Sequence, residues 1–376
     1  MENNKNNILI SRCYKIFSKA IHNRTFPGAA IGVAWGSPDK RRRIIQTYGH
    51  TTYSQENPVA EGTVYDLASL TKPLATTLAI LSLLKERRIQ LSDRVSDIFP
   101  QTRDSSLQLI SIKDILCHSA GFPAHQPYYL ELGRFPEEKR KETLLNLIAA
   151  EPLAYEPGSA SIYSDLGFML LGLIVEKKSG LELTLFFREK IAEPLGIAEK
   201  IFYGKAGPED KEDTKKIPHA PTEDCPFRKT VLCGEVSDEN AHVLGGVAGH
   251  AGLFGAMGGV LEMGVHLLDQ WQGREEHPNY LASDLRRFLI RQDIPGSTWA
   301  LGFDTPSNTG SSGGRYLAPE SVGHLGFTGT SFWIDPTRDL VMVLLSNRVH
   351  PSRENNRIKQ FRPLFHDTVI ESLGLV

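Results

Sequence analysis

The sequence predicts an α/β protein in which an antiparallel sheet is flanked by helices and interrupted by an all-helical insertion. Two pairs of short apolar runs with strand-like composition stand near the two ends of the chain, and helical patterns fill most of the region between them. Since strands from both ends must meet to bury their apolar faces, we expect residues 1–72 and 235–376 to form a sheet domain. Residues 73–234 are expected to form a helical subdomain, with a cleft between the two.

An amphipathic helix is expected first. Leu9, Cys13, Phe17 and Ala20 recur at helical spacing, and the pattern stops before Pro27. The runs GAAIGVAW and IIQTYG follow, and the turn-like GSPDKRRR separates them. This arrangement predicts a β-hairpin.

Helical patterns dominate from Thr71 to about Lys200, with breaks at HSAGFPAHQP and at EPG. One of these helices should end at Gly180, because glycine commonly follows the last helical turn. Its apolar face consists of Leu166, Leu170, Leu173 and Ile174.

The last part of the chain returns to strands. A polar, proline-rich stretch, YGKAGPEDKEDTKKIPHAPTEDCP, predicts a long surface loop, and the glycine-rich LGGVAGHAGLFGAMGGV follows it. The runs SFWID and LVMVLLSN, joined by PTRD, predict a second hairpin. A final amphipathic helix should begin near Glu354 and be kinked by Pro363.

Composition narrows the classes of function. The 376 residues carry a net charge of -2, so no strong field favours nucleic acid or an anionic membrane. The first residues lack the apolar core of a signal peptide, and no apolar run approaches the ~18 residues of a membrane span. The four cysteines are scattered without a CxxC pair, which is typical of free thiols. We therefore expect a cytoplasmic protein with a small-molecule partner, and the oligomeric state stays open.

A serine and a lysine three residues apart lie one helical turn from each other, so that the amine can take the hydroxyl proton. Three such pairs occur: Ser37 with Lys40, Ser82 with Lys85, and Ser69 with Lys72. The first falls in a charged turn. The second falls inside a helix, where a serine hydroxyl bonds back to the preceding turn. Only the third stands at a predicted helix start.

Pro73 marks that start, because proline is tolerated in the first helical turn. If Ser69 is the N-cap, Pro73 is the fourth helical residue, and Ser69 stands at the positive end of the helix dipole. Backbone N–H groups there favour a developing oxyanion. The alternative interpretation makes Ser69 only an N-cap and Lys72 a surface lysine.

Two later motifs favour the chemical interpretation. Tyr163 directly precedes a helix in EPGSASIYSDLGFMLLG, and His324 opens HLGFTGTSFWIDP, in which glycines lead into a strand. Serine with lysine, then tyrosine, then a glycine-bounded strand is the order found in SxxK acyl-transfer enzymes. With DLASLTK and ILCHSAGFP, the chain from about Pro27 onward resembles the serine beta-lactamase and penicillin-binding-protein superfamily. Within it, the class C branch is the most similar, which also holds esterases, D-aminopeptidases and peptidoglycan amidases.

The resemblance implies a beta-lactamase/transpeptidase-like fold and assigns roles to residues. Ser69 would be the nucleophile, Lys72 its partner and Tyr163 the group that transfers a proton toward the leaving atom. The backbone N–H groups of Ser69 and Phe327 would form the oxyanion hole. Lys72 must then be at least partly neutral, which burial and neighbouring positive charge would favour.

The chain departs from the family pattern at two of the positions expected to bind substrate. Asp165 stands where the family often has asparagine, and an ionised aspartate only accepts hydrogen bonds; a helix cap for the helix beginning at Leu166 is the alternative. His324 replaces a lysine that helps to bind the penicillin carboxylate, and it would hold a carboxylate only when protonated. Gly326 and Thr328 follow in the same segment and complete the expected substrate-binding set on this side.

A cluster of possible metal ligands also occurs in the sequence: Asp238, Glu239, His242 and His250. No HExxH or CxxC pattern accompanies these residues, so neither a metal nor another cofactor is expected. His250 lies among glycines, which allow close approach of the backbone to a ligand. We expect it to line the cleft.

Together these features predict a serine hydrolase that works through an acyl-enzyme. Its substrate is expected to be a small ester or amide, such as a muropeptide, a D-amino-acid peptide or a short ester, with weak action on beta-lactams. A true class C-like beta-lactamase and a D-Ala-D-Ala carboxypeptidase remain open. The alternative from another class is a penicillin-binding sensor that is acylated but does not turn over.

Overall fold

The computed structural model describes residues 2–204 and 218–376. Its longer helices and the shorter ones between them are, in chain order, α1 (Glu2–His22), α2 (Leu78–Lys85), α3 (Val95–Ile98), α4 (Ile112–Leu116), α5 (Tyr129–Leu132), α6 (Glu137–Ala150), α7 (Asp165–Ser179), α8 (Leu183–Phe187), α9 (Glu239–Val243), α10 (Met257–Trp271), α11 (Ala282–Phe288) and α12 (Ile358–Leu373). The strands are β1 (Gly28–Trp35), β2 (Arg42–Gly49), β3 (Val64–Asp66), β4 (Ile201–Tyr203), β5 (Asp224–Cys225), β6 (Thr230–Val231), β7 (Leu253–Ala256), β8 (Val322–Leu325), β9 (Ser331–Asp335) and β10 (Leu340–Ser346).

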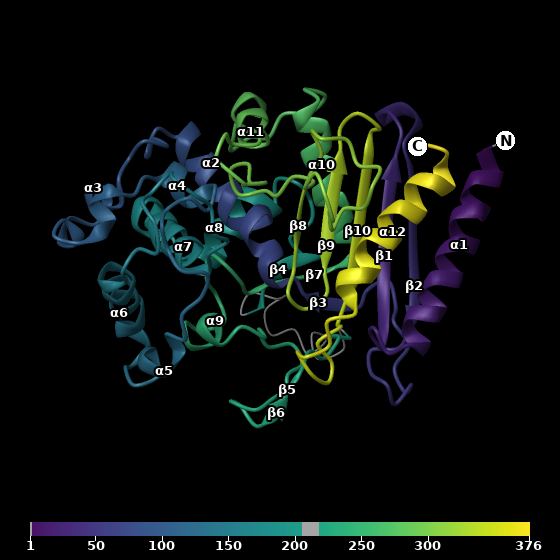
Figure 1. The fold of residues 1–376 in the computed structure, drawn as a ribbon, viewed down its shortest axis with the longest axis horizontal. Coiled ribbons are helices and arrows are strands. Elements are labelled where there is room, and N and C mark those ends of the chain that lie inside the picture. The colour runs from purple at the N-terminus through teal and green to yellow at the C-terminus, as the bar shows by residue number, and fades with distance from the viewer. Residues whose placement is uncertain (1, 205–217) are drawn as a thin grey trace.

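The main sheet joins the two ends of the chain. Its strands are antiparallel in the order β2-β1-β10-β9-β8, so the N-terminal hairpin pairs with the C-terminal strands through β1 and β10 (Figure 1). Ile31 pairs with Gln46 on one side and with Leu344 on the other. Both predicted hairpins are confirmed, and so is the antiparallel sheet that combines them.

Helices cover both faces of this sheet, which explains why its central strands are apolar without alternation. Successive side chains of a strand point to opposite faces. In β10, Val341 and Val343 belong to one hydrophobic cluster, whereas Leu340 and Met342 belong to the other. Helix α10 packs in the first cluster, and α1 and α12 pack in the second and lie side by side at one end of the molecule (Figure 1).

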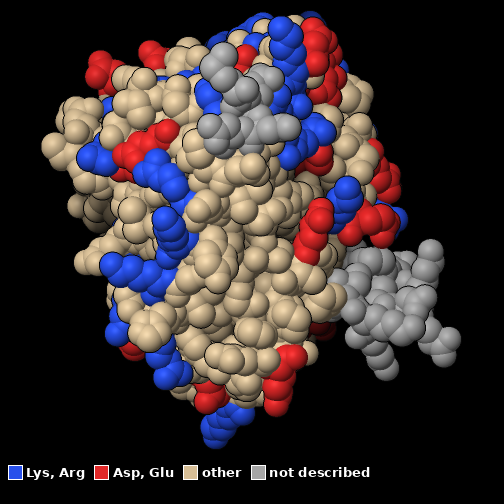
Figure 2. Space-filling view, turned by 90° about the vertical axis from the view of Figure 1, so that its right-hand side faces the viewer, with Lys and Arg blue, Asp and Glu red and all other residues tan. Residues whose placement is uncertain are grey.

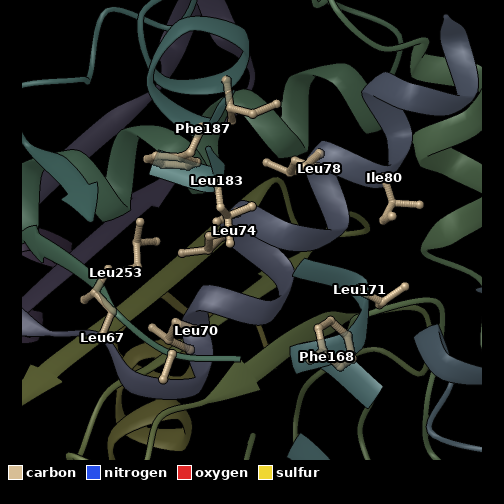
Figure 3. Close-up of a cluster of buried hydrophobic side chains, with 14 of the residues drawn as sticks. Leu67, Leu70, Leu74, Leu78, Ile80, Phe168, Leu171, Leu183, Phe187 and Leu253 are labelled. Carbon is tan, nitrogen blue, oxygen red and sulfur yellow. The ribbon is translucent and has the colours of Figure 1, made fainter. Parts of the chain in front are cut away.

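The remaining helices pack around an extension of the first cluster. Residues from the π-helical turn Lys72–Thr77, from α2, α7 and α8 and from the strand β7 belong to it, and Figure 3 shows Leu74, Leu78, Leu171, Phe187 and Leu253 in this part of the core. A small antiparallel sheet, β3-β7-β4, borders this core. The strands β4, β5 and β6 lie within the region that was expected to be entirely helical, because each is too short to leave a periodic pattern in the sequence.

Most of the predicted helix features are confirmed, and one helix start differs. The predicted face of α1 is fully covered, since Leu9, Cys13 and Phe17 are buried. Helix α7 ends at Gly180, which is in the left-handed conformation with φ of 77°. The last helix begins at Ile358, four residues later than expected, because Arg348 ties down the preceding segment by donating to the carbonyls of Arg353 and Asn355. Pro363 lies inside this helix as predicted.

The predicted surface loop from Tyr203 to Pro226 lies largely outside the described residues, and its flanks contribute to β4 and β5. The cysteines Cys13, Cys117, Cys225 and Cys233 are free, as expected. Among the described residues, no helix combines the length and apolar character needed to span a bilayer. The face that carries α1 shows charged groups of both signs around a broad uncharged centre (Figure 2).

Candidate active site

Ser69 lies in a tight turn between β3 and the first long helical segment. The turn is a 3-10 helix, Ala68–Leu70, and a π-helical turn, Lys72–Thr77, leads from it into α2. Ala68 has a left-handed backbone with φ of 48°, and its N–H donates to Asp66 Oδ1 at 2.8 Å. The prediction that Ser69 is the N-cap of the helix is therefore wrong: the aspartate stabilises the start of the turn, and the serine hydroxyl is left available.

Lys72 is completely buried and has three acceptors around its ammonium group. Nζ lies 3.0 Å from Ser69 Oγ, 2.7 Å from Asp165 Oδ1 and 3.4 Å from the carbonyl oxygen of His250. An ammonium has three N–H donors, so this environment matches the protonated lysine. The alternative that Lys72 is a solvated surface residue is excluded.

The charge of Lys72 depends on Asp165. Burial alone would lower the pKa of Lys72, but the Asp165 carboxylate and Tyr163 outweigh it, and the pKa is raised. Burial acts in the opposite sense on Asp165, yet Lys72 and then His125 hold the pKa of that carboxyl below its usual range. The expectation that Lys72 is partly neutral in the resting protein is wrong, because its dominant charged neighbour is an anion.

Tyr163 stands over this pair. Its ring centroid is 4.7 Å from Lys72 Nζ, and Trp299 stacks on it at 5.4 Å. Burial raises the pKa of the Tyr163 hydroxyl, and interactions with Lys72 and Ser69 offset only part of this effect. The resting tyrosine is therefore a neutral phenol in contact with both the nucleophile and the ammonium.

Two backbone N–H groups beside Ser69 are free. Within the described residues, neither the Ser69 N–H nor the Phe327 N–H is donated to a protein acceptor. Phe327 belongs to the loop between β8 and β9, which hydrogen bonds attach to the Ser69 turn: Thr328 Oγ1 donates to the carbonyl of Asp66 at 2.7 Å, and Thr330 Oγ1 to that of Leu67 at 3.1 Å. The two free donors are held in adjacent, mutually bonded segments.

Ser69 opens into two cavities. One, of about 320 Å³, is bordered by acidic and histidine side chains including His125, Asp238 and His250. The other, of about 400 Å³, is bordered by Trp299, His324 and basic residues that include Lys359 and Arg362. Ser69, Tyr163 and Phe327 border both. A bound substrate can thus extend to either side of the hydroxyl.

Comparison with known proteins places this geometry in context. A family model described as Beta-lactamase matches residues 15–364. The chain belongs to the beta-lactamase family. Family membership implies serine hydrolase activity. A relative from Escherichia coli (strain K12), named "Putative D-alanyl-D-alanine carboxypeptidase", is 33% identical over 338 residues, covering 84% of this chain and 75% of the relative. A relative of the same name from Salmonella paratyphi A is 32% identical, covering 86% and 77%.

Solved structures share the beta-lactamase family fold. EstCE1, described as a hydrolase with promiscuous acyltransferase activity, superposes with a TM-score of 0.73 at 21% identity, covering 96% of this chain and 98% of its own. Simvastatin synthase (LovD) from Aspergillus terreus gives 0.71 at 17%, covering 97% and 98%. The octameric penicillin-binding protein homologue from Pyrococcus abyssi gives 0.70 at 18%, covering 94% and 76%. At these identities the likeness concerns the fold alone.

The two departures from the beta-lactamase family pattern both lie at the site. Asp165 is the first residue of α7, and its side chain pairs with Lys72 instead of capping the helix. His324 is on β8 and is buried; its Nδ1 donates to the carbonyl of Leu325 at 2.8 Å. Burial, with Lys72 nearby, lowers the pKa of His324 to about 3. His324 is therefore neutral at neutral pH in the unliganded site and carries no charge for a carboxylate there.

His250 borders the cavity as expected, but its ring faces Asp238, with Nε2 2.8 Å from Oδ1. Close glycine contact brings its segment to the site: a Cβ at Gly249 would lie 2.0 Å from the carbonyl of Phe168 in α7. Only without that Cβ can the His250 carbonyl approach Lys72.

The possible metal ligands named from the sequence, Asp238, Glu239, His242 and His250, do not come together as a metal site among the described residues. Asp238 accepts from His250 and from the Ala241 N–H, and Glu239 pairs with Arg353 at 2.6 Å. A different trio, Glu223, Cys225 and Glu239, brings its ligand atoms within 4.8 Å of one another. Arg353 donates to both of its carboxylates, so a guanidinium already supplies the cation there.

Several residues at the site escaped the sequence analysis. His125 and Trp299 come from loops without a periodic pattern, and nothing in the sequence singles them out. His118 lies within the motif ILCHSAGFP, but the sequence assigned it no role. Arg362 had a usable signal: it falls four residues after Ile358 and three before Phe365, so a charged residue stands on the apolar face of α12.

Proposed function

We propose that the protein is a serine hydrolase that forms an acyl-enzyme on Ser69 and cleaves a small ester or amide. The observation that carries the proposal is the contact between Ser69 Oγ and the fully buried Lys72 Nζ at 3.0 Å, at the junction of two cavities. Of the three serine-lysine pairs in the sequence, this pair alone combines a buried amine with an accessible hydroxyl. Ser82 is itself buried, and Ser37 precedes an exposed turn.

Ser69 would attack the substrate carbonyl, and the free N–H groups of Ser69 and Phe327 would stabilise the oxyanion that forms. The proton of Ser69 must leave through Lys72 or Tyr163, the titratable groups beside it. Because Lys72 is held as an ammonium at rest, it would first pass one proton to Asp165, whose Oδ1 lies 2.7 Å from Nζ, and would then take the proton of Ser69. Tyr163 would carry the proton onward to the leaving atom.

The substrate class is proposed from the cavities and the relatives together. Two cavities on either side of one hydroxyl suit a substrate with an acyl part and a leaving part, which muropeptides and D-amino-acid peptides both have. The names of the relatives support a peptide that ends in D-Ala-D-Ala. Weak action on beta-lactams is also proposed, because a neutral His324 supplies no positive charge for their carboxylate.

Intact-mass and peptide mass spectrometry after treatment with a fluorophosphonate probe would test the nucleophile. We expect one adduct, on Ser69, in the wild type and in Ser37→Ala, and none in Ser69→Ala. Labelling of Ser69→Ala at the wild-type rate would refute the assignment.

Turnover on p-nitrophenyl acetate, nitrocefin and a D-Ala-D-Ala peptide, compared side by side, would test the substrate class. We expect clear ester cleavage and low efficiency on nitrocefin. An efficiency on nitrocefin well above that on the ester would identify a true beta-lactamase. Stoichiometric acylation without turnover on any substrate would identify a sensor.

A further inference from the structure

A buried arginine lies directly behind the loop that carries the Phe327 N–H. Arg362 belongs to α12, and only 6% of its surface is exposed. Its Nη2 donates to the carbonyl of Gly326 at 2.6 Å and to that of Thr330 at 2.8 Å. Thus a helix from the end of the chain contacts both ends of the loop between β8 and β9.

The carbonyl of Gly326 and the N–H of Phe327 belong to the same peptide group. A peptide group is planar and its C=O and N–H point in opposite directions, so a donor that fixes the carbonyl also fixes where the N–H points. We infer that Arg362 is a positioning residue that aims the Phe327 N–H at the reacting carbonyl. This inference rests on the acyl-enzyme function proposed above.

The loop needs such a restraint because the peptide group between Gly326 and Phe327 begins at a glycine. Glycine accepts backbone conformations that other residues avoid, which makes rotation of the Gly326–Phe327 peptide easy. Another residue cannot stand there, since a Cβ on Gly326 would lie 1.9 Å from Thr330 Oγ1 and 2.7 Å from the carbonyl of Leu67. The close approach of the loop to the Ser69 turn therefore requires a flexible residue, and Arg362 restricts it.

The other bonds of the loop act on different groups. Arg348 Nε donates to the carbonyl of Phe327 at 2.8 Å, which belongs to the following peptide. Thr328 and Thr330 bind the Ser69 turn through their side chains. The Gly329 N–H also donates to the Gly326 carbonyl, but at 3.2 Å and from within the same loop. Among the residues that the structure describes, Arg362 is the donor outside the loop that binds the carbonyl of this peptide.

The positive charge adds an electronic effect. The guanidinium donates to backbone carbonyls, and burial, with Arg348 nearby, lowers the pKa of Arg362 to about 9. A charged donor on a carbonyl polarises the peptide and strengthens its N–H as a donor in turn. A buried cation is costly unless its hydrogen bonds are made. Nη2 of Arg362 makes two, whereas its buried Nε has no partner among the described residues. Both bonds from Nη2 go to the loop, which favours a role in ordering it.

Arg362 also borders the second cavity, so a direct contact with an anionic substrate group is the competing explanation. An uncharged ester separates the two roles. If Arg362 orients the Phe327 N–H, its loss weakens an interaction made mainly in the transition state and lowers kcat. If Arg362 instead contacts the substrate, its loss raises KM, and only for substrates that carry an anion.

The experiment compares wild type, Arg362→Met, Arg362→Lys and the control Arg41→Met on p-nitrophenyl acetate, with thermal melts of each. Arg41 is a matched buried arginine, paired with Asp269 and outside both cavities. We expect kcat to fall about 10- to 10²-fold in Arg362→Met, below the ~10²–10³-fold cost of losing an oxyanion donor outright. The KM of Arg362→Met should stay within about 2-fold of the wild-type value. The kcat of Arg362→Lys should lie between those of the wild type and Arg362→Met. Arg41→Met should be less stable but keep the wild-type kcat.

A phenylboronic acid provides the second measurement, because its tetrahedral serine adduct uses the oxyanion hole. Its inhibition constant should rise in Arg362→Lys and Arg362→Met by the same factor as kcat falls. If Arg362→Met does not fold, Arg362→Lys decides alone. Unchanged kcat and boronate affinity in a folded variant, or an effect confined to KM for carboxylate-bearing substrates, would overturn the inference. Absence of ester turnover and of Ser69 labelling in the wild type would instead refute the proposed function.

Discussion

Asp165 determines the protonation state of Lys72 at the candidate active site. It contacts Lys72 at 2.7 Å through Oδ1, and its Oδ2 faces His125 Nδ1 at 3.4 Å. An asparagine in the same place could still accept a hydrogen bond from the ammonium, but it would not supply the negative charge that raises the pKa of Lys72. The aspartate therefore converts a buried amine, which would tend to be neutral, into an ammonium.

Replacing Asp165 by asparagine should shift the pH dependence of activity. The carboxylate raises the pKa of Lys72, so its removal lets burial lower that pKa, and the neutral base is then present at lower pH. We expect the acid limb of the kcat/KM profile on a p-nitrophenyl ester to move down by about one pH unit or more in Asp165→Asn. Asp165→Glu keeps the charge and should keep the limb. An unmoved limb in Asp165→Asn would show that Lys72 is not the titrating base.

The substitution Tyr163→Phe removes only the phenolic hydroxyl and so tests its role in turnover. The ring contacts with Trp299 and Lys72 are retained, so the fold should be unaffected. We expect turnover on the ester to fall about 10²-fold or more, as for loss of a general acid–base group. Near-normal turnover with an unchanged melting temperature would assign Tyr163 to packing alone.

At the scale of elements, the site is formed by two segments that hydrogen bonds join across the sequence. The Ser69 turn follows β3, and the loop formed by residues 326–330 connects β8 and β9. Thr328 Oγ1 donates to the carbonyl of Asp66, while Asp66 accepts from the Ala68 N–H. Any loosening of this junction should separate the two free N–H groups before it affects the rest of the fold.

Thr328→Val tests the junction with almost no change of shape. It leaves the buried carbonyl of Asp66 without the donor from Thr328, which should cost about 1–3 kcal/mol of stability. We also expect kcat on the ester to fall about 10-fold, since misplaced donors stabilise the oxyanion less. Thr328→Ser keeps the hydroxyl and should restore most of both. Equal kinetics in the valine and serine variants would mean that the bond contributes to stability only.

The elements that the sequence predicted were those whose own residues carry a local signal. Helix α1 has a buried face that recurs at helical spacing, whereas β1, β2, β9 and β10 are short apolar runs separated by turn residues. Strands β3, β4, β7 and β8 have four residues or fewer, too few for a period to be seen. Their pairing depends on partners distant in the sequence, and neither a motif nor a propensity records such partners.

The candidate site was also predictable only in part. Ser69, Lys72 and Tyr163 were predicted, and the structure brings them together, because a motif and its order along the chain identify them. Their protonation was not predictable, since it depends on Asp165 and on burial that only the folded chain provides. The same holds for His324, whose burial and neutrality follow from the packing around β8.

At the scale of the whole molecule, buried neutral histidines should make stability depend on pH. His366 on α12 is buried, and its Nδ1 donates to the carbonyl of Ser312 at 3.0 Å. Burial lowers the pKa of His366 from 6.5 to about 3. Between these values the unfolded chain binds a proton that the folded chain does not, so this contribution is fully present above about pH 6.5 and is lost as pH falls toward 3.

His366→Asn keeps a donor toward the Ser312 carbonyl but cannot titrate. Relative to this variant, the wild type should lose about 1.4 kcal/mol of unfolding free energy per pH unit below about pH 6. Urea denaturation of both proteins at pH 7, 6 and 5 measures the difference. Parallel stability curves would show that His366 is protonated in the folded state.

Helices α1 and α12 lie side by side at the end of the molecule away from the helical region (Figure 1), and Lys5 Nζ donates to the carbonyl of Leu373 at 2.7 Å. The two extremities of the described chain are therefore neighbours, and neither borders the cavities at Ser69. A covalent crosslink between the two helices at this contact would therefore leave the opening at Ser69 free. The same geometry makes this end of the molecule suitable for attachment to a solid support, with the opening at Ser69 still accessible to substrate.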